Sequence, residues 1–143
     1  MNDPFRIAEA VVSELNGHSF SRSFTAVRLV VPSFELAELA TLHVSVMPAS
    51  AAQALETRAC IKRDIHIDIG VQQKIAGDIE AEVPPLMDLV EDIAAFLTRR
   101  PLADAADAMW TKTTVDPLYL RDHLVEQRLF TSIVSVDYRL LEV

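Results

Sequence analysis

Three side chains that can do chemistry stand at alternate positions of the stretch CIKRDIHIDIGVQ, namely Asp64, His66 and Asp68. In a strand such residues share one face, and neighbours at i and i+2 lie about 6 to 7 Å apart. An imidazole between two carboxylates is typical of a metal site or of acid/base catalysis. A catalytic zinc usually takes three protein ligands, and His43 on another expected strand is the candidate that would complete the set. The function class this implies is a small metal-dependent hydrolase that uses His66, Asp68 and His43.

The residue pattern of the same stretch favours a plainer interpretation. Polar residues fall on even positions, and apolar residues fall on the odd positions Ile61, Ile65, Ile67, Ile69 and Val71. Arg63 is the exception on the apolar side. This alternation predicts a long strand from Cys60 to Gln72 with one buried and one polar face. We therefore predict that the three side chains face solvent or a neighbouring subunit, and that they form neither a catalytic nor a metal site.

Composition limits the function classes further. The chain has 143 residues, of which 50% are hydrophobic, and this is sufficient for one domain, residues 1–143, with a real core. Its net charge of −8, without a basic patch, argues against tight binding of nucleic acid. An acidic surface is compatible with a protein that lets DNA pass. Cys60 is the single cysteine, so no intrachain disulfide is possible.

Searches for targeting segments and for known catalytic motifs find none in the sequence. The start MNDPFRIAEAVVSELNG has no basic region and no unbroken apolar run, so we expect neither a signal peptide nor a membrane span, and a cytoplasmic protein. The three glycines are scattered, which excludes the usual phosphate-binding and dinucleotide-binding loops. HExxH and GxSxG are absent. We expect no cofactor.

The first half of the chain is predicted to form a helix followed by strands. The helix is predicted to begin with Asp3 as N-cap and Pro4 in the first position, and to stop at Gly17. A strand is expected from Ser23 to Pro32, and residues 33–40 fit either a helical turn or a bent strand. A strand over residues 41–48 is expected to end at Pro48. Residues 49–58 are expected to form a small-residue loop or one helical turn.

The second half is predicted to contain one strong helix and two strands. The helix should begin at Pro84 and Pro85 and end before Pro101, and its apolar stripe should pack on Ile65, Ile67 and Ile69. The stripe consists of Leu86, Leu89, Val90, Ile93, Phe96 and Leu97. Strands are expected over Met109–Val115 and over about ten residues from Phe130 to Leu140, with residues 117–128 forming a loop with at most one helical turn. The fold predicted is an α+β two-layer sandwich, a mostly antiparallel four- to five-stranded sheet with two amphipathic helices on one face.

Six residues are candidates for a contact with another subunit or a partner protein. Tryptophan is enriched at the centres of interfaces, so Trp110 beside Lys112 marks one candidate surface, although a core position fits Trp110 equally well. The others lie on the polar face of the long strand or just before it. The six candidates are Arg58, Asp64, His66, Asp68, Trp110 and Lys112.

Four segments, taken in this order, resemble one protein family. They are LATLHVSVMPAS, ETRACIKRDIHIDIGVQQKI, LMDLVEDIAAFLTRR and EQRLFTSIVSVDYRL. Together they resemble the tail terminator (tail completion) proteins of long-tailed bacteriophages and prophages, of the lambda-like minor tail protein U type. The resemblance spans residues Phe5 to Leu141 and rests on the order of strands, a threonine–arginine step before the long strand and a phenylalanine-led last strand.

The resemblance implies a structural protein with no catalytic residues and no cofactor. Its copies would form a ring, as a hexamer, that caps the tail tube, stops tube polymerisation and forms the head–tail joining interface. Its partners would be further copies of itself, the tail tube protein and the head–tail connector proteins, with DNA passing through the lumen without specific binding. The protein would be located in the virion tail or neck and be assembled in the host cytoplasm. Another neck adaptor, such as a head-closure or connector protein, and the metal-dependent hydrolase remain alternatives.

Overall fold

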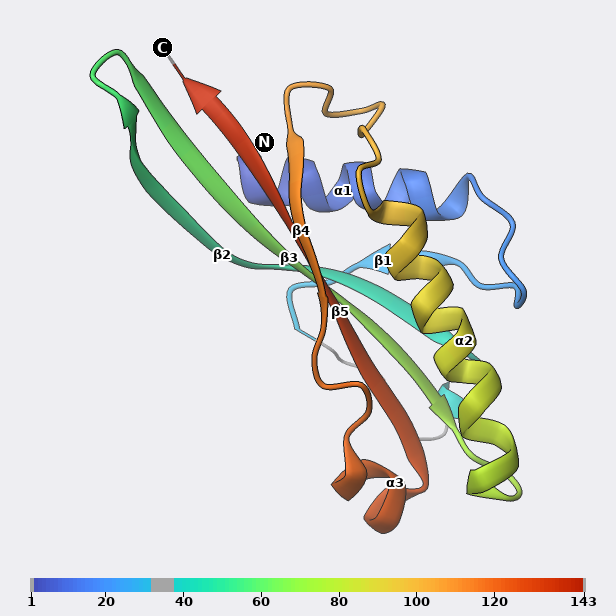
Figure 1. Cartoon of the computed structure of the whole chain (residues 1–143). Helices are drawn as coiled ribbons and strands as arrows, with labels where there is room; N and C mark the ends of the chain where they lie inside the picture. The colour runs from blue at the N-terminus through green and yellow to red at the C-terminus, as the bar shows by residue number, and fades with distance from the viewer. Residues whose placement is uncertain (1, 32–37, 143) are drawn as a thin grey trace.

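The computed structural model describes residues 2–31 and 38–142 and contains one mixed sheet (Figure 1). The elements in chain order are α1 (Asp3–Asn16), β1 (Ala26–Arg28), the 3-10 turn η1 (Glu38–Ala40), β2 (His43–Thr57), β3 (Cys60–Lys74), α2 (Ile79–Leu97), β4 (Met109–Val115), α3 (Arg121–Gln127) and β5 (Leu129–Glu142). The five strands are ordered β1-β2-β3-β5-β4. All described pairs are antiparallel except β1–β2. The predicted α+β class with a mostly antiparallel sheet is confirmed.

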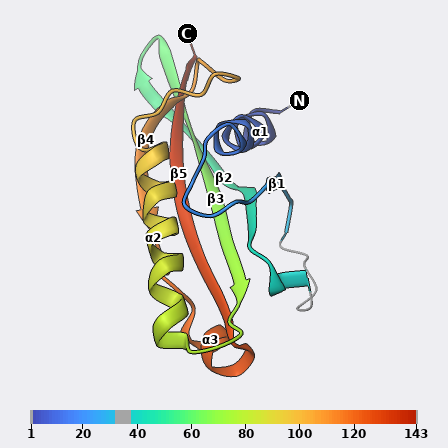
Figure 2. The ribbon, with the colours of Figure 1, turned by 90° about the vertical axis from the view of Figure 1, so that its right-hand side faces the viewer.

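Both long helices cover one face of this sheet. In Figure 2, α1 lies over β2 and β3 whereas α2 lies beside it over β5 and β4. The odd-numbered residues of β3 and the even-numbered residues of β5 point toward the helices. They pair as Ile65 with Tyr138, Ile67 with Val136 and Ile69 with Val134, and all six are fully buried. The opposite face of the sheet, here called the open face, carries the polar side chains.

The start of α1 differs from the prediction by one residue. Asn2, not Asp3, is the N-cap, and its side-chain oxygen accepts a hydrogen bond from the backbone N–H of Phe5 at 3.1 Å. Asp3 is instead the first helical residue, and its carboxylate binds two arginines. Gly17 caps the other end as predicted.

The segment after α1 contains less strand than expected. Of the strand expected from Ser23 to Pro32, only the three residues of β1 form a strand among the described residues, and they run parallel to β2. The amide of Asn16 holds β1 in place, because its Oδ1 accepts from Ala26 N at 2.7 Å and its Nδ2 donates to Ala26 O at 3.1 Å. The chain between β1 and β2 is long enough for the crossover that a parallel pair of strands requires. Pro32 and residues 33–37 lie outside the described residues, and Glu38–Ala40 form the helical turn that was one of the two alternatives.

Pro48 does not end its strand. β2 passes a register shift between Pro48 and Ser50 and continues to Thr57, so the predicted loop over 49–58 is wrong. Proline is tolerated at bulges and on edge strands, and both conditions hold here because β1 reaches only Val46. The distal part of the β2–β3 hairpin, residues 49–63, is here called the arm (Figure 1), and β5 pairs with it as far as Ile61. The predicted strand from Cys60 is confirmed and continues to Lys74.

α2 begins earlier and ends earlier than predicted. Its N-cap is Asp78, whose side chain accepts from Glu80 N, and Pro84 and Pro85 lie inside the helix. A side-chain cap together with acidic residues in the first turn stabilises a helix start, and these signals precede the prolines. The helix ends at Leu97, with Thr98 as C-cap.

The predicted apolar stripe of α2 is buried except at one position. Phe96 is only half-buried, at the rim of the core, where its ring stacks on His18 with centroids 4.3 Å apart. The strands β4 and β5 occupy their predicted positions. Between them, the segment expected to hold at most one helical turn contains the seven-residue helix α3.

Candidate functional site

The open face carries a ladder of polar pairs between β3 and β5. Asp64 lies opposite Arg139, His66 opposite Asp137 and Asp68 opposite Ser135. Arg139 donates to both carboxylate oxygens of Asp64, from Nε at 2.8 Å and from Nη2 at 3.3 Å. These hydrogen bonds from Arg139 hold the pKa of Asp64 below its ordinary value, against a smaller opposing effect of burial.

His66 lies between two carboxylates at the centre of this ladder. Its Nδ1 is 2.5 Å from Asp137 Oδ1, and its Nε2 is 3.0 Å from Asp68 Oδ1. Ser135 Oγ donates to the same Asp68 oxygen at 2.7 Å. The side chains of His66, Asp68 and Asp137 are each about one-third exposed, at 35%, 30% and 29%. The arrangement joins the two central strands on their solvent side, and both imidazole nitrogens are already engaged.

His43 cannot complete a metal site with His66. It pairs with Gln72, which lies six residues along β3 from His66, a separation of about 20 Å. The hypothesis that His43, His66 and Asp68 share a metal ion is therefore wrong. Within residues 2–31 and 38–142, no group of three or more His, Cys, Asp or Glu side chains is arranged to hold a metal.

The two neighbouring candidates on β4 face opposite sides of the sheet. A register shift at Thr111 separates Trp110, which lies opposite Tyr138 on the core face, from Lys112, which lies opposite Asp137 on the open face. Trp110 is half-buried against the core, and its Nε1 donates to Thr113 Oγ1 at 2.7 Å. Lys112 is exposed and extends the row formed by His66 and Asp137 across the sheet.

Arg58 lies apart from the other candidates. It is in the turn at the tip of the arm and is exposed. The structure thus gathers Asp64, His66, Asp68 and Lys112 on the open face, and places Arg58 at the end of the arm.

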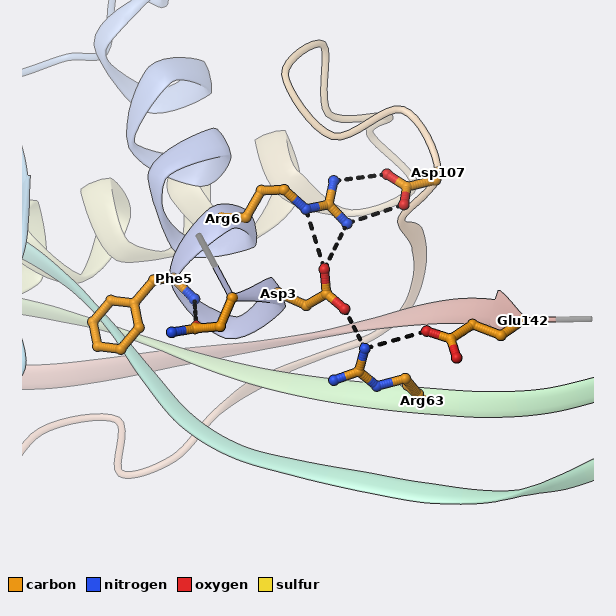
Figure 3. Close-up of polar contacts among 7 residues, drawn as sticks. Asp3, Phe5, Arg6, Arg63, Asp107 and Glu142 are labelled. Atoms are coloured by element: carbon orange, nitrogen blue, oxygen red, sulfur yellow. Dashed lines mark hydrogen bonds and ion pairs between the residues drawn. The ribbon is translucent and has the colours of Figure 1, made fainter.

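A further charged cluster, not predicted from the sequence, closes one end of the core (Figure 3). Arg6 donates to both carboxylate oxygens of Asp107 at 2.9 and 3.0 Å, and also to Asp3 at 3.1 Å. Arg63 forms ion pairs with Asp3 and, at 3.3 Å, with Glu142. The hydrogen bonds that Arg6 donates to Asp107 lower the pKa of Asp107 and raise the pKa of Arg6. The one available signal in the sequence was the arginine on the apolar side of an otherwise regular strand.

Comparison with known proteins gives a structural match without a sequence match. No family model and no curated protein matches the chain. Among solved structures, the chain is similar to the sheath/tube terminator, in its extended state, of PVC, an extracellular contractile injection system. The similarity covers 100% of this chain and 58% of that chain, with a TM-score of 0.50 and 14% sequence identity. The two proteins share a fold, and this chain spans little more than half the length of the terminator.

Among the described residues, no helix is long and apolar enough to cross a membrane.

Proposed function

We propose that this protein is a non-enzymatic terminator of a tail tube. Copies of the chain form a ring, as a hexamer, that caps the finished tube, stops its polymerisation and presents the surface to which the head connector binds. The observation that carries the proposal is the fold, which over the full chain is similar to that of a sheath/tube terminator. The family resemblance of four sequence segments points independently to the same role.

The surface chemistry supports the same proposal. A net charge of −8 disfavours a protein that holds DNA, and it suits a lumen through which DNA passes without specific binding. The open face offers paired and partly exposed polar groups, as expected for a surface that contacts the tube protein, the connector or another copy. On this proposal the single domain is part of the virion tail or neck and is assembled in the host cytoplasm.

The test is tube termination in a defined reaction. The purified chain is added to tail tube subunits during polymerisation, with a parallel reaction that lacks the chain. Tubes should be shorter when the chain is present from the start, and averaged electron micrographs should show one ring at the head-proximal end. Finding the protein along the tube, at the distal tip or absent from particles would sink the proposal. A ring on the connector but not on free tubes would support the neck-adaptor alternative instead.

A further inference from the structure

The arm exposes apolar groups that a lone subunit leaves in water. Every residue of β2 from Ala49 to Thr57 is exposed, and Leu55 is 73% exposed. Its cross-strand neighbour Ile61 is 40% exposed. In the part of the chain that the structure describes, no strand pairs with the outer edge of β2 beyond Val46. Natural proteins usually protect such an edge, and exposed apolar side chains beside it mark a contact surface.

A groove between α2 and α3 offers an apolar surface at the other end of the molecule. Val125 of α3 is 79% exposed on one wall, and Met87 of α2 is half-buried on the other. Glu80 lines the groove at the start of α2, and Arg121 lines it at the start of α3. The apolar lining includes Ile79, Val83, Pro84, Met87, Tyr119 and Val125.

The arm is basic, and the two helices that form the groove are acidic. Residues 49–63 contain one acidic and three basic residues, a net charge of +2. Lys62 is paired with Glu56, and Arg63 with Asp3 and Glu142, so Arg58 is the basic residue that the arm presents at its tip. α2 and α3 together contain seven acidic residues and one basic residue, Arg121, which lines the groove with Glu80; their net charge is −6. In both views the arm lies at one end of the molecule and α3, with the start of α2, at the other (Figures 1 and 2). The two surfaces therefore cannot meet within one chain, but they can meet between two.

We propose that the tip of the arm binds in the α2–α3 groove of a second copy of this chain. Leu55 and Ile61 pack against the apolar walls, and Arg58 lies beside Glu80. Because the two surfaces differ, the contact is head-to-tail, and repetition of such a contact closes a ring when the rotation permits. This inference rests on the proposed function and deepens it, since it names the surfaces that join neighbours in the ring.

Disulfide trapping tests the contact. In the full chain, Cys60→Ser removes the native thiol, and Leu55→Cys with Val125→Cys places one thiol on each surface. Mild oxidation of concentrated protein, alone and with tail tubes, should give covalent multimers longer than dimers in at least one condition. Each single-cysteine variant can form dimers only. The matched control is Leu55→Cys with Ser13→Cys, because Ser13 is exposed on α1 outside the groove. Only monomers and dimers from the Leu55/Val125 pair in both conditions, or equal multimers from the control, would overturn the inference.

A charge exchange supplies the second test. Arg58→Glu and Glu80→Arg should each reduce the multimers from the cysteine pair several-fold, and the combined exchange should restore them. Failure of the exchange to restore them would count against the pairing of these two residues. Absence of multimers from a protein that still terminates tubes would reject this contact and leave the function standing. Multimers from a protein that never affects tube length would support the contact and reject the function.

Discussion

The guanidinium of Arg63, on the core side of β3, forms an ion pair with the carboxylate of Asp3 at the start of α1, 60 residues earlier in the chain. Both side chains are largely buried, with exposures of 21% and 24%. Asp3 also binds Arg6, so it is the shared partner of two arginines (Figure 3). The pair fastens the first turn of α1 to the sheet.

Removal of Asp3 should destabilise the fold more than removal of Arg63. Asp3→Ala leaves a partly buried guanidinium with less compensation, and we expect a loss of about 1 to 3 kcal/mol in the free energy of unfolding. Arg63→Met also removes Nε, which in the described structure is buried without a hydrogen-bond partner, and should change stability by less than about 1 kcal/mol. Urea titration of both variants measures the difference. Equal losses would contradict this account of the pair.

Tyr138 is fully buried, and its hydroxyl has no hydrogen-bond partner among the described residues. Burial, and to a smaller extent the charge of Glu14, raises the pKa of Tyr138. A buried polar group without a partner costs about 1 to 3 kcal/mol, so Tyr138→Phe should stabilise the protein by roughly 1 kcal/mol. Thermal unfolding measures the effect, with Tyr119→Phe as control because Tyr119 is half-exposed. A marked loss of stability would show that the hydroxyl is hydrogen-bonded.

The Asp64–Arg139 pair should give a pH-dependent contribution to stability. The pKa of Asp64 in the folded protein lies below its ordinary value of 3.8, chiefly because of the hydrogen bonds from Arg139. The contribution is therefore complete above the pKa of the unfolded chain and is lost as pH falls through the folded pKa. Asp64→Asn should lower the melting temperature at neutral pH, and the difference from the native chain should vanish in strong acid. Arg139→Gln should behave alike, and the double variant should add little. A difference that persists in strong acid would mean that charge is not its cause.

The elements predicted best from the sequence are those whose residues follow a single periodicity. β3 and β5 alternate over most of their lengths, so their approximate positions and their buried faces were predictable from side-chain type alone. Pro48 and the pair Pro84–Pro85 misled the prediction, because a bulge on an edge strand and a capped helix start tolerate proline. The Asp3 carboxylate was predicted to cap α1, whereas in the structure it forms ion pairs with Arg6 and Arg63.

The open face could be predicted only in part. Alternation placed Asp64, His66 and Asp68 on one polar face, as observed. Their partners on β5 follow from a pairing of residues about 70 positions apart, which no local pattern specifies. Trp110 and Lys112 are two residues apart and would share a face in a regular strand, but the bulge at Thr111 separates them.

Phe96 should contribute less to stability than its place in the apolar stripe predicts. Full burial would make Phe96→Ala cost about 3 to 5 kcal/mol, but the ring is half-buried between His18 and Arg100, whose guanidinium lies 4.1 Å from the ring centroid. We expect about 1 to 3 kcal/mol, below the loss caused by Leu89→Ala at a fully buried position of the same helix. Denaturant titration of the two variants measures the two losses of stability. A Phe96→Ala loss as large as that of Leu89→Ala would mean that the rim is as well packed as the core.

Replacement of the whole polar ladder on β3 separates a contact surface from a catalytic one. The combined variant Asp64→Asn, His66→Gln and Asp68→Asn changes only side chains on the open face, so the core under α1 and α2 stays intact. Because each ion pair is partly exposed, we expect a total loss of no more than about 2 kcal/mol. If the open face contacts a partner, the variant should remain folded, by circular dichroism, while its effect on tube length falls. Metal analysis and a hydrolase screen run on both proteins complete the test. Loss of a stoichiometric metal or of a hydrolytic activity in the variant would contradict the non-enzymatic interpretation.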